Sequence, residues 1–414
     1  MLKTSVSIAI SLFSLCLLMM SYTCIAKPSK STVETTKIIV AANRSYLYLP
    51  KLQGKRVGLI VNQTSMLTNG NGQKLHLVDH LLANNIDVKV IFAPEHGFRG
   101  DHDAGAKVTN NIDSKTGLEI ISLYGKTRKP PAKTLSKLDV LVFDIQDVGV
   151  RFYTYISTMH YAMQAALNAD IEFMVLDRPN PNISLIDGPM LESKFSSFVG
   201  LDKIPLLHGM TVGELAKMIK GEGWLNNGKN SSFNSPEKKH LKLTVIPVAN
   251  YTRDNEYILP IKPSPNLPNQ NSIYLYPQLG FFEATAVSIG RGTAFPFQVI
   301  GHDKVKLGDF AFTPVSMKGA ASNPKLMNKL LYGQYFQKEQ HPKFTLKLFL
   351  DTYQKFKAKG INFIKNPQFL DKLAGNDKFR KALVAGKSFA QIKQSWQQDL
   401  MEFKQQRRPY LLYH

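Results

Sequence analysis

The chain has 414 residues, more than one average domain, and its 43% hydrophobic and 20% charged residues are ordinary for a globular protein. A chain of this length and composition can form a hydrophobic core that is stable without disulfide bonds. The formal net charge of +21 should draw the protein toward polyanions. For an exported chain, an anionic envelope polymer or a carboxylate-bearing substrate is a better partner than nucleic acid; alternatively, the dispersed lysines only keep the surface soluble.

The first 26 residues are typical of a secretory signal peptide. Lys3 supplies the positive n-region, residues 6–20 are apolar, and Ala26 offers a small residue at the cleavage point. A lipid anchor on Cys24 is the alternative, which the three residues before it suit poorly. Cleavage after Ala26 removes Cys16 and Cys24, the two cysteines of the chain. We therefore expect an exported protein, periplasmic or extracellular, with no disulfide, no thiol nucleophile and no later membrane span.

Beyond a polar leader, apolar runs alternate with amphipathic segments. The apolar runs predict strands of the buried parallel type at residues 56–62, 88–95, 118–123, 139–143, 171–176 and 241–247. The segments between them predict helices at residues 38–49, 75–83, 155–168 and 211–221, the last with Thr211 as N-cap and Glu214 three residues later. This alternation predicts a right-handed βαβ array and an α/β fold with a Rossmann-like, doubly wound sheet.

The proline-rich segment 262–268 is the strongest break in the chain. It predicts a boundary between an N-terminal Rossmann-like domain, residues 37–262, and a smaller α+β C-terminal domain, residues 263–414. For the latter we expect a strand at 297–300 and helices at 323–332, 345–358 and 377–406.

Polar side chains follow four of the predicted strands. They are Asn62, Glu95, Asp144 and Asp177. Ligands of open α/β sheets sit beyond the carboxyl ends of the strands, so the four together predict a site, although each alone could be a helix cap. Glu95 and His96 are the most notable, because three glycines follow them closely and require a tight loop.

A second candidate acid lies in the C-terminal half. Glu283 stands between Phe281-Phe282 and an apolar run that ends in Gly290-Arg291-Gly292. Apolar surroundings disfavour a charged carboxylate, which suits a general acid. Arg291 is placed to meet an anionic group, although it could instead hold a turn carbonyl.

Other chemistries have weaker signals. Glu95, His96 and the acids and histidine of residues 101–103 are metal-ligand types, but their spacing matches no standard zinc site. Gly70-Asn71-Gly72 is not a dinucleotide fingerprint, and no Gly-x-Ser-x-Gly elbow is present. We predict neither a metal nor any other cofactor.

Several long motifs, in this order, resemble the exo-β-N-acetylmuramidase NamZ family of peptidoglycan hydrolases from about residue 37 onward. They are Pro94 to Asp101, Asp144 to Tyr155, Leu176 to Pro181, Pro263 to Asn266, Glu283 to Thr285 and Ser288 to Thr293. The resemblance implies a Rossmann-like domain without a nucleotide, a smaller C-terminal domain, and an active-site cleft between them in which Glu95 faces Glu283.

The chain departs from the family pattern at three places. Ala284 and Ala286 replace a usual glycine and asparagine, Ala106 stands where an acid is frequent, and Tyr251 stands where a tryptophan is common. These changes bear on which substrate is accepted more than on the type of reaction, because both glutamates are present.

The resemblance implies an enzyme that releases N-acetylmuramic acid from the non-reducing ends of peptidoglycan fragments. Glycosidic hydrolysis uses two carboxyl groups, or one acid with help from the 2-acetamido group. Glu95 would be the general acid/base and Glu283 its partner, although the roles could be exchanged. Cationic contacts to the lactyl carboxylate would come from Arg151, Arg178 or Arg291, and contacts to sugar hydroxyls from His96, Asp144, Gln146 and Tyr153.

Two alternatives stay open at this point. The first is a non-catalytic envelope protein that holds muropeptides in its cleft, and the second is a related cell-wall hydrolase with a different bond specificity. Several of the candidate residues could also be structural: Asp144 as a helix cap, Arg151 as a surface ion-pair partner, and Tyr153 as part of the core.

Overall fold

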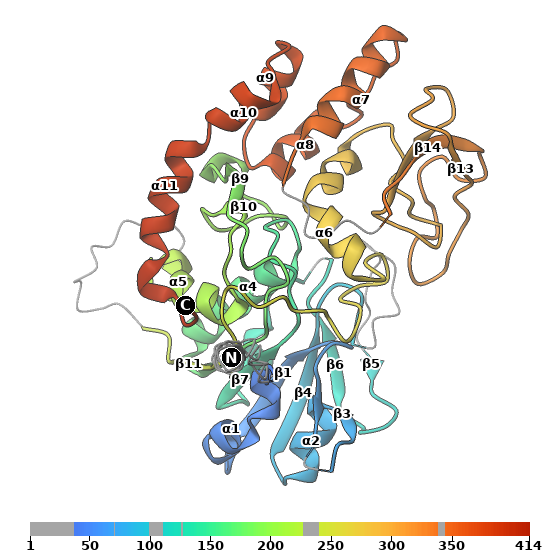
Figure 1. Cartoon of the computed structure of the whole chain (residues 1–414). Helices are drawn as coiled ribbons and strands as arrows, with labels where there is room; N and C mark the ends of the chain where they lie inside the picture. The colour runs from blue at the N-terminus through green and yellow to red at the C-terminus, as the bar shows by residue number, and fades with distance from the viewer. Residues whose placement is uncertain (1–36, 70, 99–110, 126, 227–239, 338–343) are drawn as a thin grey trace, which may run out of the picture. The chain divides into compact units, whose positions relative to one another are not determined.

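A seven-stranded sheet forms the centre of the fold (Figure 1). The computed structural model describes residues 37–69, 71–98, 111–125, 127–226, 240–337 and 344–414, of which residues 38–414 belong to one compact unit. Neighbouring strands are parallel except for the edge pair β5–β6. In spatial order the strands are β11 (Leu243–Ile246), β8 (Glu172–Leu176), β7 (Val140–Asp144), β1 (Arg56–Val61), β4 (Asp87–Ala93), β6 (Glu119–Ser122) and β5 (Asn111–Ile112).

The order of the six parallel strands confirms the predicted doubly wound sheet. Numbered along the chain and starting from β6, they read 3-2-1-4-5-6, the order of Rossmann-like sheets. The strand order reverses between β1 and β7, so the crevice expected for a ligand lies at the carboxyl ends of these two strands and their neighbours.

Both faces of the sheet are buried, which explains why its strands are continuous apolar runs. Leu59 and Val61 of β1 pack on one face with α1 (Ser45–Leu52) and α2 (Leu77–Ala83). Ile60 faces the other way, toward α4 (Tyr155–Ala169) and α5 (Val212–Gly221). The second face belongs to the larger core, which also includes the C-terminal helices.

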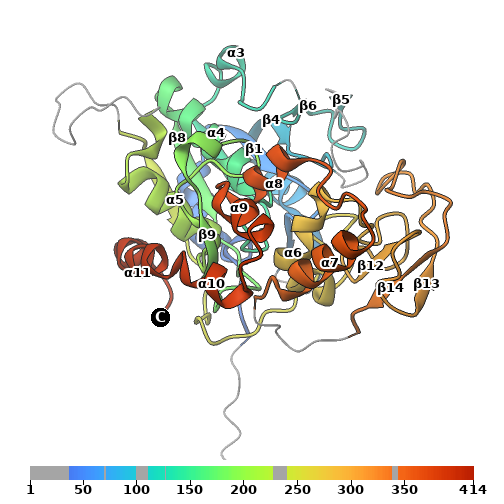
Figure 2. The ribbon, with the colours of Figure 1, turned by 90° about the horizontal axis from the view of Figure 1, so that it is seen from above.

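The C-terminal part combines helices with a small antiparallel sheet. Its sheet has the order β12 (Val299–His302), β14 (Leu331–Tyr335), β13 (Phe310–Phe312). Its helices are α6 (Gln270–Leu279), the 3-10 helix η4 (Gly280–Ala284), α7 (Lys347–Ala358), α8 (Pro367–Ala374), α9 (Lys378–Val384), α10 (Phe389–Gln394), α11 (Gln397–Gln406) and η5 (Arg408–Tyr410). Figure 2 shows α6, α7, α8 and α9 over the middle of the molecule, with β12, β13 and β14 to one side.

Short elements complete the first half. They are η1 (Ala41–Asn43), the hairpin β2 (Met66–Thr68) and β3 (Lys74–His76), α3 (Ala132–Leu135), the hairpin β9 (Asp187–Met190) and β10 (Pro205–Leu207), η2 (Ser193–Phe195) and η3 (Trp224–Asn226).

Most predicted elements are confirmed, and two in the C-terminal part are wrong. Thr211 and Glu214 form the expected capping box at the start of α5. Residues 323–332 are not a helix, because Leu326 and Asn328 have positive φ and Leu331 begins β14. Residues 377–406 form three helices rather than one, since the chain turns at Gly386 (φ 72°) and Ser388 starts a new capping box.

The end of the chain returns to the parallel sheet, beside α5 (Figure 1). Tyr413 donates its hydroxyl to Asp177 Oδ2 at 2.6 Å, and the Leu412 amide donates to Glu214 Oε1 at 2.8 Å. The expected domain boundary at residue 262 stays a prediction.

The predicted signal peptide lies outside the described residues. Among the residues that are described, no helix is both long enough and apolar enough to cross a membrane.

Candidate active site

One cavity, of about 330 Å³, has both predicted catalytic glutamates in its wall; we call it the glutamate cavity. Glu95 reaches it from the carboxyl end of β4, and Glu283 reaches it from η4 in the C-terminal half. Eight of the other lining residues are Phe or Tyr: Tyr124, Phe152, Tyr153, Tyr155, Phe198, Tyr276, Phe297 and Phe369. Arg128, Thr154 and Arg291 are among the polar ones.

The turn after β4 fixes Glu95 at the edge of the sheet. The Gly97 amide donates to Pro94 O at 3.0 Å, and His96 and Gly97 both have positive φ, 70° and 77°. A positive φ is uncommon for a non-glycine residue, and such strained residues concentrate at functional sites. His96 itself is buried in the wall of the cavity.

Two hydroxyl groups meet the Glu95 carboxylate. Thr154 Oγ1 donates to Glu95 Oε2 at 2.7 Å. The Tyr124 hydroxyl lies close to the same carboxylate, and burial together with that negative charge raises the pKa of this hydroxyl. Thr154 stands directly before α4 but does not use its side chain to cap that helix, so its hydroxyl serves Glu95.

Two cations hold Glu283. Arg291 donates to Glu283 Oε1 from Nε at 2.9 Å and from Nη2 at 2.6 Å, and its guanidinium carbon lies 4.9 Å from the ring centre of Phe297. Lys325 donates to the backbone carbonyls of Phe282, Glu283 and Thr285 at 2.7–2.9 Å. Burial lowers the pKa of Lys325 to about 8.

Tyr276 connects the two acids electrostatically. Burial, then the charge of Glu283 and more weakly that of Glu95, raises the pKa of its hydroxyl well above the usual range. Its ring packs against Phe152, Tyr153 and Phe297, with ring centres 4.9–5.8 Å apart. The two carboxylates therefore share a cavity whose wall is a fixed aromatic cluster.

Of the predicted substrate-binding residues, His96, Tyr153 and Arg291 lie in the glutamate cavity and four others do not. Asp144 and Arg178 form a fully buried ion pair, with Arg178 Nε and Nη2 at 2.6 and 2.9 Å from the carboxylate oxygens. Arg178 also donates to Met66 O, so this pair joins the ends of β7 and β8 to β2.

Gln146 and Arg151 are likewise engaged with the backbone. Gln146 donates to the carbonyls of Asp147 and Pro179. Arg151 is fully buried, and it donates to the carbonyls of Pro189, Ile204 and Leu373 at 2.7–3.0 Å. Arg151 thus ties the β9–β10 hairpin to α8, and neither residue is retained among the proposed sugar contacts.

The remaining strand-end residues are structural too. Asn62 Oδ1 accepts hydrogen bonds from the amide and the hydroxyl of Thr64. Asp177 accepts the Thr211 hydroxyl and the Gly213 amide at the start of α5, and the Tyr413 hydroxyl. Of the four polar strand ends, only Glu95 lines the cavity.

Sequence reasoning missed Tyr124, Arg128, Thr154, Phe198, Tyr276 and Lys325. Thr154 stood inside a motif that was already singled out, between Tyr153 and Tyr155. Nothing local distinguished the others, because they come from loops and from a proline-containing helix.

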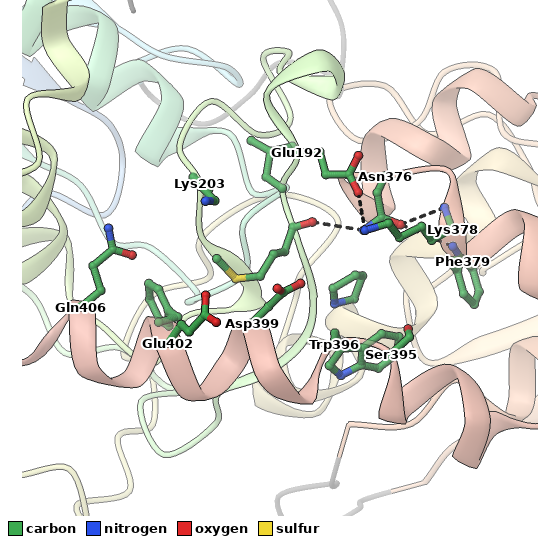
Figure 3. Close-up of a pocket in the computed structure, with 14 residues that line it drawn as sticks. Glu192, Lys203, Asn376, Lys378, Phe379, Ser395, Trp396, Asp399, Glu402 and Gln406 are labelled. Atoms are coloured by element: carbon green, nitrogen blue, oxygen red, sulfur yellow. Dashed lines mark hydrogen bonds and ion pairs between the residues drawn. The ribbon is translucent and has the colours of Figure 1, made fainter. Parts of the chain in front are cut away.

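A second cavity, of about 440 Å³, lies between β9, α9 and α11 (Figure 3). Glu192 there pairs with Lys378 at 2.9 Å, and Asn376 Nδ2 donates to Met190 O at 3.2 Å. Its other acids, Asp399 and Glu402, are both exposed on α11. This second cavity is larger than the glutamate cavity, but it has no pair of shielded carboxyl groups from two parts of the fold. We therefore place the candidate active site in the glutamate cavity.

Within the described ranges, no group of three or more histidine, cysteine, aspartate or glutamate side chains could hold a metal ion.

Two family models together match nearly the whole described chain. The model of "Exo-beta-N-acetylmuramidase NamZ, N-terminal" matches residues 57–271, and that of the C-terminal part matches residues 274–413. The chain is also similar to the peptidoglycan beta-N-acetylmuramidase NamZ of Bacillus subtilis (strain 168), with 40% identity over 391 residues that cover 88% of this chain and 89% of that protein.

Two crystal structures of DUF1343 family proteins from Bacteroides fragilis NCTC 9343 share the fold. One is 43% identical, with a TM-score of 0.80, and the match covers 92% of this chain and 99% of that one. The other is 30% identical, with a TM-score of 0.76, and covers 91% and 99%.

Proposed function

The chain belongs to the exo-β-N-acetylmuramidase NamZ family, and from this premise we propose that it is a glycoside hydrolase that releases N-acetylmuramic acid from the non-reducing ends of peptidoglycan fragments. The reaction serves cell-wall turnover. The observation that carries the proposal is the placement of Glu95 and Glu283, 188 residues apart in sequence, in the wall of one cavity. Two carboxyl groups that flank a glycosidic bond are the usual machinery of its hydrolysis.

The surroundings of the two glutamates favour different roles. Thr154 and Tyr124 meet Glu95 with hydroxyl groups that can orient its carboxyl group for proton transfer to the leaving oxygen. Glu283 is paired with the Arg291 guanidinium, which fixes one of its carboxyl oxygens. We assign Glu95 as the general acid/base and Glu283 as the anionic partner, which attacks, activates water or steers the 2-acetamido group.

The walls of the cavity suit a sugar ring. Tyr153, Tyr276 and Phe297 present aromatic surface, and Arg291 Nη1 is a buried donor without a partner among the described residues. A substrate oxygen that accepts this hydrogen bond would relieve the cost of the unpaired donor. The volume, about 330 Å³, lies at the small end of ligand sites, as suits an enzyme that takes one terminal unit at a time.

Two of the departures from the family pattern, Ala284 and Ala286, follow Glu283 closely in the sequence. Ala284 is buried in the larger core, and Ala286 packs against that core. Neither lines the glutamate cavity. Ala106 lies outside the described residues. The non-catalytic binding protein therefore gains no support from the two alanines that the structure describes.

The direct test is release of 4-nitrophenol from 4-nitrophenyl β-N-acetylmuramide, with the N-acetylglucosaminide as the comparison substrate. We expect release from the muramide and its loss in Glu95→Gln. A wild-type protein that turns over neither this substrate nor peptidoglycan strands, but binds muropeptides, would establish the binding protein instead.

We also propose that the protein is exported, on the basis of the apolar segment that follows Lys3. Expression of the full chain followed by N-terminal sequencing of the mature protein should give Lys27 as the first residue. A chain that keeps residues 1–26 in the cytoplasm would contradict export without touching the proposed activity.

A further inference from the structure

N-acetylmuramic acid differs from N-acetylglucosamine by a lactyl ether that carries a carboxylate. We propose that Arg128 receives this carboxylate at the rim of the glutamate cavity and so makes the site specific for the muramic acid unit. The inference rests on the proposed function and adds to it the residue that reads the substrate's charge.

The other arginines considered for this role are already committed. Arg178 forms a buried pair with Asp144, and Arg151 is buried among backbone carbonyls outside the cavity. Arg291 lines the cavity, but its charge is balanced by Glu283 at 2.6 Å. A guanidinium that is already paired with a carboxylate attracts a second carboxylate only weakly, because the net charge of the pair is zero.

Arg128 differs from these arginines in combining a place in the cavity wall with a charge that no described acid balances. Its side chain lines the glutamate cavity, and it forms no ion pair with any acid that the structure describes. It is exposed, so its charge is hydrated rather than buried, and a carboxylate can approach it without a large desolvation cost. Guanidinium groups bind carboxylates through two parallel hydrogen bonds, which gives direction as well as attraction.

An aromatic stack fixes the position of Arg128. Its guanidinium carbon lies 4.6 Å from the ring centre of Phe198, a buried residue. The Phe198 ring packs against Tyr124 at 5.8 Å and lies parallel to Tyr161 at 6.2 Å. A cation over such a ring is held by the ring quadrupole while its edge stays open to a ligand. Because Tyr124 also meets Glu95, the stack connects the proposed carboxylate site to the general acid.

The neighbouring residue provides a matched control. Lys129 carries the same charge one position later, but its ammonium lies over Tyr161, bonds Gln164 and does not line the cavity. A long-range effect of positive charge would be shared by Lys129, whereas direct contact with the substrate would belong to Arg128 alone.

The experiment compares two substrates and three proteins. The substrates are 4-nitrophenyl β-N-acetylmuramide and its analogue in which the lactyl carboxylate is an uncharged carboxamide. The proteins are the wild type, Arg128→Met and Lys129→Met, each checked for an unchanged melting temperature. We expect Arg128→Met to lower kcat/KM for the acid by about 10- to 100-fold, mainly through KM, as for loss of a charged hydrogen bond. For the carboxamide the change should be less than about threefold, and Lys129→Met should alter neither value beyond that.

Three outcomes would overturn the assignment: an equal loss on both substrates, an equal loss in Lys129→Met, or no loss in Arg128→Met. If the wild type hydrolyses neither substrate, the proposed hydrolase function is wrong, but the role of Arg128 can still be tested by binding. Calorimetry would then compare the affinity of the protein for free N-acetylmuramic acid with its affinity for N-acetylglucosamine. Tighter binding of the muramic acid by the wild type, lost in Arg128→Met, would then support this role; equal binding of both sugars, or of neither, would refute it.

Discussion

Arg291 holds a single oxygen of Glu283: its Nε and Nη2 atoms lie 2.9 and 2.6 Å from Oε1. Oε2 accepts no hydrogen bond from a residue that the structure describes. The carboxylate therefore has one oxygen that is fixed by the protein and one that can face a substrate. A two-oxygen pairing would orient the acid more strictly, whereas this one leaves the second edge of the carboxylate open to a substrate.

The first prediction concerns Glu283 itself. Glu283→Gln should keep the shape of the side chain but remove the anion, and kcat should fall by about 10²- to 10⁴-fold. Steady-state hydrolysis of the muramide measures this. Glu402→Gln, on the exposed face of α11, is the control and should stay within about twofold of the wild type. A Glu283→Gln protein that keeps the wild-type rate would remove this residue from the mechanism.

The second prediction concerns Thr154, whose hydroxyl donates to Glu95 at 2.7 Å. Thr154→Val keeps the volume and removes the donor, so Glu95 should be less well oriented and kcat should fall by about tenfold. The melting temperature should change little, because the hydroxyl does not cap α4. In a protein that already carries Glu95→Gln, Thr154→Val should cause no further fall in kcat. A full extra loss in that double variant would show that Thr154 acts independently of Glu95.

The fold was predictable where its signals are local. Buried parallel strands are continuous apolar runs, so β1, β4, β7 and β8 could be recognised one by one, and their alternation with helices implied the doubly wound sheet. Glu95 was found because it follows such a strand. Glu283 and Arg291 are only eight residues apart, and both could be singled out within one stretch, although their mutual ion pair was not foreseen.

Tertiary contacts determine the features of the fold and the site that could not be predicted from the sequence. Arg151 looks like a substrate-binding cation, but its carbonyl partners stand 38, 53 and 222 residues away in the chain. Such long-range contacts leave no local pattern. Residues 323–332 have the composition of a helix, yet Lys325 is drawn to the η4 carbonyls and the segment then enters β14. Strand pairing and burial of Lys325 here override helix propensity.

A third prediction follows from Asp147, which is buried close enough to Tyr153 and Tyr276 to affect their hydroxyls electrostatically. Its Oδ2 accepts the Gly149 amide, while Oδ1 has no partner among the described residues. Burial raises the pKa of Asp147 from 3.8 to about 7. Between these two values the folded state holds a proton that the unfolded state releases, so this group makes stability fall as pH rises from about 4 to about 7.

Asp147→Asn should remove this dependence. At pH 8 the variant should melt about 1–2 °C higher than the wild type, which corresponds to roughly 1 kcal/mol for a chain of this length, and at pH 4 the advantage should vanish. Thermal unfolding at both pH values measures it. Asp309→Asn, at an exposed position, is the control and should show no such pattern. A variant that is equally destabilised at both pH values would mean that the carboxylate has a partner that only an anion satisfies.

The last prediction concerns Lys325, whose ammonium donates to three carbonyls around Glu283. A neutral amine has only two hydrogens, so its deprotonation leaves one buried carbonyl without a donor and removes a positive charge near Glu283 and Arg291. Since burial lowers the pKa of Lys325 to about 8, kcat should decline as the pH rises through that value. Loss of the fold is not the cause, because a lysine with a lowered pKa makes stability rise with pH between about 8 and 10.5.

Two variants separate charge from packing. Lys325→Arg stays protonated, so its decline of kcat should move to higher pH, whatever its activity at the optimum. Lys325→Met leaves three carbonyls without their donor, so it should lose roughly 1–3 kcal/mol of stability and about tenfold or more in kcat at every pH. The pH profile of kcat for the muramide distinguishes them. If the decline near pH 8 persists unchanged in Lys325→Arg, another group causes it, and Lys325 has only a structural role.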